Sequence, residues 1–581
     1  MPDPPTSRPR QITCVLIAAA LFLLSVILRY NSPEGAFGGL TDDHHFYATY
    51  GWQLLFGDLP DRDFSDPGFP LTIAISGALQ VLERSVWPEY AFCVAALSFG
   101  TALTFLLAVR ASGSIVVGLG AALFQFALLP RLYNYPKIII YTVAIPALWA
   151  WIATPGRRRT WLVAGVTVFA ALLRHDHGAY VGAAFGLVLI AMVDVPWRDR
   201  LRHGLLFGVA TLVCLAPYLT YLQVNGGIVR HFDHALRWAS TEQAKNPLVI
   251  PTPSWVPLTG TDANESTHTD WWNRAPFSVL DEHYYVWWTY WLFLLLPFVA
   301  LVFLVVLRHT GPPYTRQAQL QILVLIALTA IVNIRLLRDN LGGRLADVSV
   351  LNAVLGAWVV AAVGRLVLSD RRWPVRMPVL VGLAARVALA TTAAAVIVFT
   401  AAILTRTVAV VVRDSSLPRG FEAVMLDASR VTRDTERTWP LDMWTNETRG
   451  LIGLSKYLNA CTAPADRILM VPFFPQVYGL AQRGFAGGRQ DLRGGRSDSP
   501  EDQRLTVERL RRQSVPIVIG PPEGDMEELA RDFPLITEHL RREYRDVGHY
   551  DVGDGLDFTL LVHHGASQVG TYEPLGLPCF H

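Results

Sequence analysis

Long apolar segments alternate with short polar ones over roughly the first two thirds of the chain. An apolar run of about 20 residues is the length that crosses a bilayer as a helix. Eleven runs fit or approach this length, at 12–28, 88–109, 114–129, 138–153, 160–173, 178–194, 204–222, 286–307, 318–334, 348–368 and 379–404. The run at 160–173 is short for a full crossing and leaves a re-entrant segment as an alternative.

From about residue 410 the pattern changes to that of a soluble domain. Residues 467–472 and 515–520 predict short buried strands that end in turns, and 447–460, 501–512 and 525–541 predict amphipathic helices. The glycine pairs at 487–488 and 494–495 lack the spacing of a phosphate-binding loop. The fold class is therefore an α-helical multi-pass membrane protein with a C-terminal α/β domain. Its parts are an N-terminal segment 1–11, a transmembrane module 12–409 with polar loops 30–87 and 223–285, and the α/β domain 410–581.

Composition agrees with a membrane protein. Hydrophobic residues make up 52% of the chain and charged residues only 17%, whereas a soluble domain carries about 25% charged residues. The net charge of +2 says little about partners, because a nucleic-acid binder would show a concentrated basic face, and we expect no nucleic-acid partner. The first apolar run has no small-residue cleavage site before Asn31-Ser32-Pro33, so we interpret it as a retained helix in the plasma (inner) membrane.

Arginines between the runs predict the sidedness. With the N-terminus in the cytoplasm, the loops at 157–159, 198–202, 308–316 and 371–376 are all basic and lie inside. Eleven spans then place loops 30–87 and 223–285 and the α/β domain on the periplasmic or extracellular face.

Several outer loops carry basic residues against this rule. Because arginine suits the geometry of phosphate, these residues suggest an anionic ligand, and snorkelling to lipid head groups is the alternative. The segment at 174–177 interrupts two apolar runs with four polar residues, and we expect hydrogen bonds from it to a phosphate or sugar. The residues predicted to bind the phosphate or substrate are Lys137, Arg174, His175, Asp176, His177, Arg338, Asp339 and Arg344.

An acidic pair, Asp42 and Asp43, follows the first apolar run. Thr41 can cap a helix whose first turn holds both acids, where the helix dipole favours negative charge. One interpretation is a plain capped helix next to the membrane, and the other is catalysis. His44 with His45, or the two histidines of 174–177, are weaker metal candidates, because their spacing is unlike that of common metal sites.

A longer motif follows the acidic pair, Gly57-x-Leu59-Pro60-x-Arg62-Asp63-Phe64-x-Asp66-Pro67. Together with the many spans and the C-terminal outer domain, it resembles the GT-C superfamily of glycosyltransferases that use polyprenyl-phosphate sugars. The similarity is to the bacterial branch of protein mannosyltransferases and lipid A aminoarabinose transferase, that is, glycosyltransferase families 39 and 83. Arg62, Asp63 and Asp66 are secondary candidates, which we expect to shape the loop.

The resemblance implies a function for the acidic pair. Asp42 or Asp43 would be the general base on the acceptor, or would hold a divalent cation (magnesium or manganese) that positions the donor phosphate. Asp42 is preferred as the first of the pair. The reaction would be an inverting transfer of a sugar from a polyprenyl-phosphate donor to an outer acceptor, which would be a cell-envelope glycan, lipid or protein.

Two other classes remain in view. A transporter or flippase of a lipid-linked or anionic envelope precursor would place ionisable groups near the bilayer midplane and would often repeat its halves, whereas the spans here are nearly uncharged in their middles. A non-catalytic assembly protein would leave the acidic pair unexplained. The sequence names neither the sugar, the acceptor nor an oligomeric state.

Cysteine positions lead to one further prediction. Of the five cysteines, Cys461 and Cys579 are the two placed outside the membrane by the predicted topology. An oxidising outer compartment favours their pairing. We expect a disulfide that pins the C-terminal tail to the α/β domain.

Overall fold

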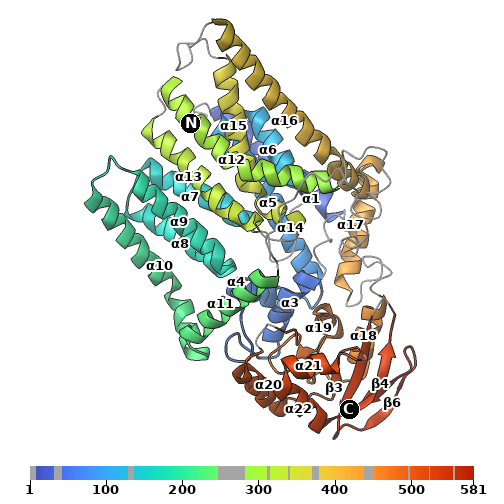
Figure 1. Cartoon of the computed structure of the whole chain (residues 1–581). Helices are drawn as coiled ribbons and strands as arrows, with labels where there is room; N and C mark the ends of the chain where they lie inside the picture. Colours follow the sequence, from blue (N-terminus) through green and yellow to red (C-terminus); the bar gives the residue numbers. More distant parts are fainter. Residues whose placement is uncertain are drawn as a thin grey trace.

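The protein is described here by a computed structural model. It describes residues 8–31, 42–128, 137–245, 282–310, 315–337, 341–368, 379–437, 449–494, 498–522, 524–553 and 556–580. Long helices form a bundle in the first part of the chain, and a smaller mixed domain follows in the last part (Figure 1).

Each of the eleven predicted spans coincides with or overlaps a helix of the bundle. These helices are α1 (Arg8–Tyr30), α5 (Trp87–Ser112), α6 (Ile115–Ala127), α7 (Ile138–Ala153), α8 (Arg157–Leu173), α9 (His175–Ala191), α10 (Trp197–Asn225), α12 (Glu282–Thr310), α13 (Arg316–Asn333), α15 (Ser349–Leu368) and α16 (Val379–Asp414). By length and composition, seven of them can cross a membrane. The range 160–173 lies in α8, a continuous helix that packs against α7, α9 and α10.

Loops expected on one side of the membrane meet at one end of the bundle. At the end predicted to face outward, Lys137 Nζ lies 2.8 Å from Asp347 Oδ2. At the opposite end, Arg316 Nε lies 2.9 Å from Asp194 Oδ2. Each of these ion pairs joins two loops that the predicted topology places on the same side. Which end faces the cytoplasm stays a prediction from loop charge.

Shorter elements lie at the ends of the bundle. They are α3 (Asp42–Leu54), α4 (Pro70–Leu82), α11 (Ile228–Lys245), η4 (Ile334–Leu336), α14 (Leu341–Asp347), η5 (Leu417–Arg419) and α17 (Phe421–Glu436). Figure 1 shows α3, α4 and α11 between the bundle and the C-terminal domain.

The C-terminal domain has a mixed five-stranded sheet of order β2-β1-β3-β5-β4 and a two-stranded sheet of β6 and β7. Strands β2, β1 and β3 run parallel, and β5 is antiparallel to β3 and β4. The strands are β1 (Arg467–Met470), β2 (Gly484–Phe485), β3 (Ile517–Ile519), β4 (Tyr544–Asp551), β5 (Asp557–His563), β6 (Gln568–Tyr572) and β7 (Leu577–Phe580). The helices are α18 (Arg449–Ala460), α19 (Gln476–Ala481), α20 (Pro500–Arg512), α21 (Met526–Asp532) and α22 (Pro534–Glu543).

Side chains alternate across this sheet and build two cores. On one face, Ile468 and Met470 pack with residues of α18 and α19. On the other face, Leu469 packs with residues of α20, α21 and α22. The first core also contains Phe46 and Tyr50 of α3, so the outer end of the bundle and the domain share one apolar interface.

Two boundaries differ from the prediction. The single helix expected at 525–541 is two helices, α21 and α22, because Pro534 lacks an N–H and restricts the residue before it, Phe533. The module boundary at 409 falls inside α16, because the apolar run continues through residues 408–412.

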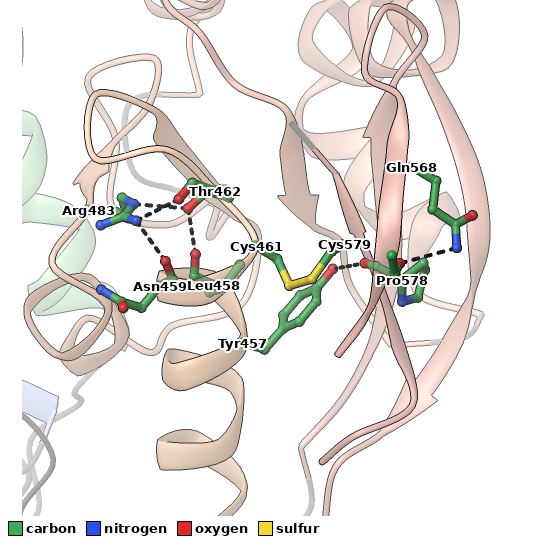
Figure 2. Close-up of a disulfide and its surroundings, with 10 residues drawn as sticks. Tyr457, Leu458, Asn459, Cys461, Thr462, Arg483, Gln568, Pro578 and Cys579 are labelled. Carbon is green, nitrogen blue, oxygen red and sulfur yellow. Dashed lines mark hydrogen bonds between the residues drawn. A yellow bond between two sulfur atoms is a disulfide. The ribbon is translucent and has the colours of Figure 1, made fainter. Parts of the chain in front are cut away.

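The predicted pair of cysteines is bonded in the structure. Cys461, directly after α18, and Cys579 in β7 form a disulfide with their Cα atoms 4.7 Å apart (Figure 2). Beside it, the hydroxyl of Tyr457 donates a hydrogen bond to the carbonyl of Pro578 at 2.8 Å. The last strand is therefore tied to α18 by a covalent and a polar contact.

Candidate functional site

The acidic pair begins a short helix at the outer end of the bundle. α3 starts at Asp42, as predicted. Thr41 and the side chains of Asp42 and Asp43 lie outside the described residues. The next residue, His44, is buried, and its Nε2 lies 2.8 Å from Glu89 Oε2 in the first turn of α5. Glu89 also accepts hydrogen bonds from Ser76 and Gln80 of α4. A buried polar network thus anchors the start of α3.

The two histidines of α3 take part in packing. The rings of His44 and His45 are 6.0 Å apart in an edge-on arrangement. Burial, followed by the neighbouring His44, lowers the pKa of His45 to about 3, so His45 stays neutral. Among the described residues, no group of three histidine, cysteine, aspartate or glutamate side chains could hold a metal ion.

The motif acids Asp63 and Asp66 stabilise the loop between α3 and α4. Asp63 Oδ2 accepts a hydrogen bond from the backbone N–H of Leu59 at 2.8 Å and lies 2.6 Å from Arg62 Nη2. Asp66 is 1% exposed, and its Oδ1 accepts the N–H groups of Gly68 and Phe69, each at 2.8 Å. Both acids satisfy backbone donors that a loop leaves unpaired. These contacts match the loop-shaping role expected for them.

A histidine of α11 meets this loop. His231 Nδ1 lies 2.8 Å from Asp61 Oδ1, and the imidazole is fully buried while the carboxylate is 9% exposed. Burial lowers the pKa of His231, but the hydrogen bond and charge of Asp61 outweigh it and raise that pKa above its usual value. Burial, aided by the charge of Asp61, raises the pKa of Asp66 to about 6. Asp61 itself has a φ of 64°, which is uncommon for a residue other than glycine.

Three cations gather at the outer end of the bundle, and we call them, with Asp176 and Asp347, the cation cluster. Lys137 precedes α7, Arg174 caps α9, and Arg335 follows α13. Lys137 pairs with Asp347 at 2.8 Å, and Arg174 Nε pairs with Asp176 Oδ1 at 2.9 Å. Arg335 Nη1 lies 3.6 Å from the other oxygen of Asp176. Three cations thus face two carboxylates.

His177 extends this cluster into the bundle. It is buried between the hydroxyl of Tyr141, 2.6 Å from His177 Nδ1, and Arg335, whose Nη1 contacts His177 Nε2. Arg335 is not among the residues that the sequence predicted to bind the phosphate or substrate. Its position directly after the apolar run of α13 could have indicated it.

The other four predicted phosphate or substrate residues are not placed in the cation cluster by the contacts above. His175 does not join the cation cluster. Its ring packs instead 5.3 Å from His231 and against Gly68, because adjacent residues at a helix start point in different directions. Arg344 is half-buried on α14. Arg338 and Asp339 lie outside the described residues.

Two aromatic rings connect the cation cluster to α3. The guanidinium of Arg174 lies 5.4 Å from the ring centre of Phe69. The ring of Phe69 packs edge-on against Tyr47 at 4.8 Å. Tyr47 lies one helical turn after Asp43 on α3. The cations, the loop and the helix that begins with the acidic pair therefore form one continuous site.

Comparison with known proteins gives a likeness to solved structures. No protein-family model and no curated protein matches the sequence. The fold is similar to a crystal structure of ArnT from Cupriavidus metallidurans bound to undecaprenyl phosphate, with 13% identity, 96% of this chain and 99% of that chain covered, and a TM-score of 0.48. For ArnT from the same organism in the apo state, the identity is 12%, the coverage 95% and 97%, and the TM-score 0.44.

Proposed function

We propose that the protein is an integral-membrane glycosyltransferase of the GT-C type, which moves a sugar from a polyprenyl-phosphate donor to an acceptor on the outer face of the membrane. One observation carries the proposal most directly. The cation cluster is joined through Phe69 and Tyr47 to the helix that begins with Asp42 and Asp43. A phosphate-binding group and a carboxylate pair in one site are the two parts that this chemistry needs.

The reaction is a single displacement at the anomeric carbon. The acceptor hydroxyl attacks this carbon while its proton passes to Asp42 or Asp43, with Asp42 the first choice. The bond between the anomeric carbon and the phosphate oxygen breaks, and polyprenyl phosphate leaves with the bonding electron pair. Attack opposite the leaving group inverts the anomeric centre.

The cation cluster acts on the leaving group. The donor phosphate carries one negative charge and gains a second as the glycosidic bond breaks. Cations that face it therefore stabilise the transition state more than the bound donor, which is what raises the rate. Arg174 and Arg335 share Asp176, and a phosphate can take over part of this pairing through the remaining N–H groups of the guanidinium planes.

The position of the cations favours an enzyme over a transporter. Lys137, Arg174 and Arg335 lie at the ends of α7, α9 and α13. A transporter for an anionic solute places such groups near the bilayer midplane. The arrangement instead suits a substrate with its lipid in the bilayer and its phosphate at the surface.

The acidic pair is the first test. Purified protein in lipid nanodiscs would be assayed for consumption of a polyprenyl-phosphate sugar, with the sugar chosen from mass spectrometry of envelope glycans in a deletion strain. We expect Asp42→Asn or Asp43→Asn to lower transfer about 100-fold to 10,000-fold. Asp233→Asn, an exposed acid on α11, is the matched control. Wild-type transfer by both variants would refute the assignment.

A divalent cation is a separate question for the same assay. If Asp42 or Asp43 acts as a base, transfer persists in EDTA. If the pair instead holds magnesium or manganese, chelation abolishes transfer and either metal restores it.

The phosphate role is tested at the three cations of the cluster. Arg174→Lys and Arg335→Lys keep the charge but lose the planar fork, so we expect both to weaken donor use. Lys137→Met leaves the buried Asp347 unpaired and should cost about 3 to 5 kcal/mol of stability. The double variant Lys137→Met/Asp347→Leu should recover stability without activity. Recovery of both would give Lys137 a purely structural role.

A further inference from the structure

The helix α17 exposes large apolar side chains at the end of the bundle that carries the candidate site. Leu417 of η5 is 37% exposed, and Phe421, Met425 and Leu426 of α17 are 73%, 53% and 65% exposed. We call these four residues the α17 patch. Single exposed apolar residues are normal on a protein surface, but several that are close together mark an interaction surface.

The opposite side of α17 packs against the bundle. Val424 and Val431 are seven residues apart, which places them on one face of the helix, and both are buried. Val431 belongs to the main hydrophobic core of the bundle. The bundle therefore holds α17 in place and leaves the α17 patch uncovered.

The start of α17 lies at the level where the spans end. Val411, in the last turn of α16, packs with Leu28 and Phe126. Leu28 lies in the last turn of α1, and Phe126 lies in the last turn of α6. α16 ends at Asp414, directly before the turn that leads to Leu417. The α17 patch thus begins where three helices reach the same end of the bundle.

The far end of α17 lies near the same level. Thr432 Oγ1 lies 2.7 Å from the hydroxyl of Tyr30, the last residue of α1. The indole N–H of Trp87, the first residue of α5, donates to this hydroxyl at 2.9 Å. Tyrosine and tryptophan are enriched where a bilayer meets water. Both ends of α17 therefore lie near the membrane surface.

The chain reaches the α17 patch directly from a lipid-facing helix. α16 is one of the helices that can cross a membrane, and it exposes Val387, Ile397 and Val398 along its length. Figure 1 shows α17 directly after α16, on the way to the C-terminal domain. The patch therefore continues the apolar surface that α16 presents to lipid.

The exposed surface of α17 changes from apolar to polar along the helix. The α17 patch ends at Leu426, in the first half of the helix. The exposed residues of the second half are all polar, namely Ser429, Arg430, Arg433 and Glu436. This order fits a helix whose first half contacts lipid tails and whose second half contacts head groups and water.

Net charge gives this segment no attraction to anionic lipid. Residues 413–437 include five arginines and five acids. Asp427 lies 3.3 Å from Arg419 and 3.6 Å from Arg430, so two of these arginines are paired within the segment. Contact with a membrane must therefore come from apolar burial.

We propose that α17 is a membrane-surface helix and that the α17 patch lies in the lipid of the leaflet at this end of the bundle. A helix of this kind places its apolar side chains about 5 to 10 Å into the boundary between head groups and acyl chains. Burial of the patch in lipid stabilises this position, since the same side chains would otherwise face water. This inference concerns the membrane alone and is independent of sugar transfer.

The test measures whether the α17 patch contacts lipid or water. A spin label is attached to Phe421→Cys or Met425→Cys in the full-length Cys214→Ala protein, whose other free cysteines are buried. Each labelled protein is placed as a single copy in phosphatidylcholine nanodiscs. Collisions of the label with oxygen, which enters lipid, are compared with collisions with a water-soluble nickel chelate. The reference for lipid is Val398→Cys, which is exposed on α16.

The matched control is Val569→Cys, which replaces an exposed apolar residue of β6 in the C-terminal domain. We expect the ratio of oxygen to nickel collisions at both α17 positions to be at least about threefold higher than at Val569→Cys. Phe421→Glu should lower the ratio at Met425→Cys, because a carboxylate resists burial in lipid, whereas Phe421→Leu should leave it unchanged. The ratio should also be the same with and without phosphatidylglycerol.

Three results would overturn the proposal. Ratios at the α17 positions equal to that at Val569→Cys would show that the patch faces water. Protection of both labels from oxygen and nickel alike would show that protein covers the patch. A high ratio that requires phosphatidylglycerol would show that charge, and not apolar burial, holds the helix at the membrane.

Discussion

Removing the disulfide should destabilise the C-terminal domain more than any change at a lone cysteine. Cys461 and Cys579 are 118 residues apart in sequence. In the chain-entropy treatment, a bond that closes a loop of this length restricts the unfolded chain by about 5 kcal/mol at 25 °C. The unfolding temperature of the double variant Cys461→Ala/Cys579→Ala should therefore be about 10 to 20 °C lower than that of the wild type. Alanine avoids placing a hydroxyl in the apolar surroundings of Cys461.

The loss should begin at the end of the chain. β7 pairs with β6 alone, and a two-stranded hairpin has little stability of its own. Its other supports are the buried side chains of Leu577 and Phe580 and the bond from Tyr457 to Pro578. Without the disulfide, we expect amides of β6 and β7 to exchange with deuterium before those of β1 or β3.

The assay combines thermal unfolding in detergent with hydrogen exchange under non-reducing conditions. Cys214→Ala removes a cysteine that has no bond, and its unfolding temperature should match the wild type within about 2 °C. The reasoning fails if the double variant unfolds at the same temperature as Cys214→Ala. It also fails if Cys461 and Cys579 of the native protein react with a thiol reagent.

Two further predictions concern the loop between α3 and α4. Because the pKa of Asp66 is raised from 3.8 to about 6, its contribution to stability is complete below pH 3.8 and is lost as the pH rises through 6, by about 3 kcal/mol. Asp66→Asn should reduce the fall in unfolding temperature as the pH rises from 4 to 6. His231→Gln should reduce the fall above pH 6.5, because the raised pKa of His231 also makes the protein less stable as the pH rises. Unchanged pH profiles would contradict both assignments. Gly488→Ala should lower stability by about 2 kcal/mol or more, because Gly488 has a φ of 74° and a Cβ there would lie 2.3 Å from a backbone oxygen of the loop. Gly570→Ala meets open space and should unfold like the wild type.

The positions and lengths of the apolar runs alone located the helices of the bundle. A long apolar run forms a helix in lipid because every backbone group must be satisfied within the segment. The α/β domain followed from short apolar runs between amphipathic helices, and β1 and β3 lie where expected. The break at Pro534 shows the limit of this reasoning. The apolar pattern continues across the proline, but the helical backbone does not.

The site was harder to predict, since the pattern of apolar residues does not show which loops meet. Lys137 and Asp347 are 210 positions apart, and Arg335 meets His177 across 158. His175 and Asp176 are neighbours in sequence, yet one faces α11 and the other faces Arg335. Sequence could name the residue types for a phosphate site but could not sort them between two clusters.

The loop between α3 and α4 contacts the cation cluster, α11 and α20. On one side, Phe69 packs against Arg174. On the other, Arg509 bonds to the carbonyl of Arg62, and Asp61, in its uncommon backbone conformation, is held by His231 of α11. The acids of this loop therefore fix its backbone, through His231 and through backbone N–H groups, and in doing so they fix the ring of Phe69 beside Arg174.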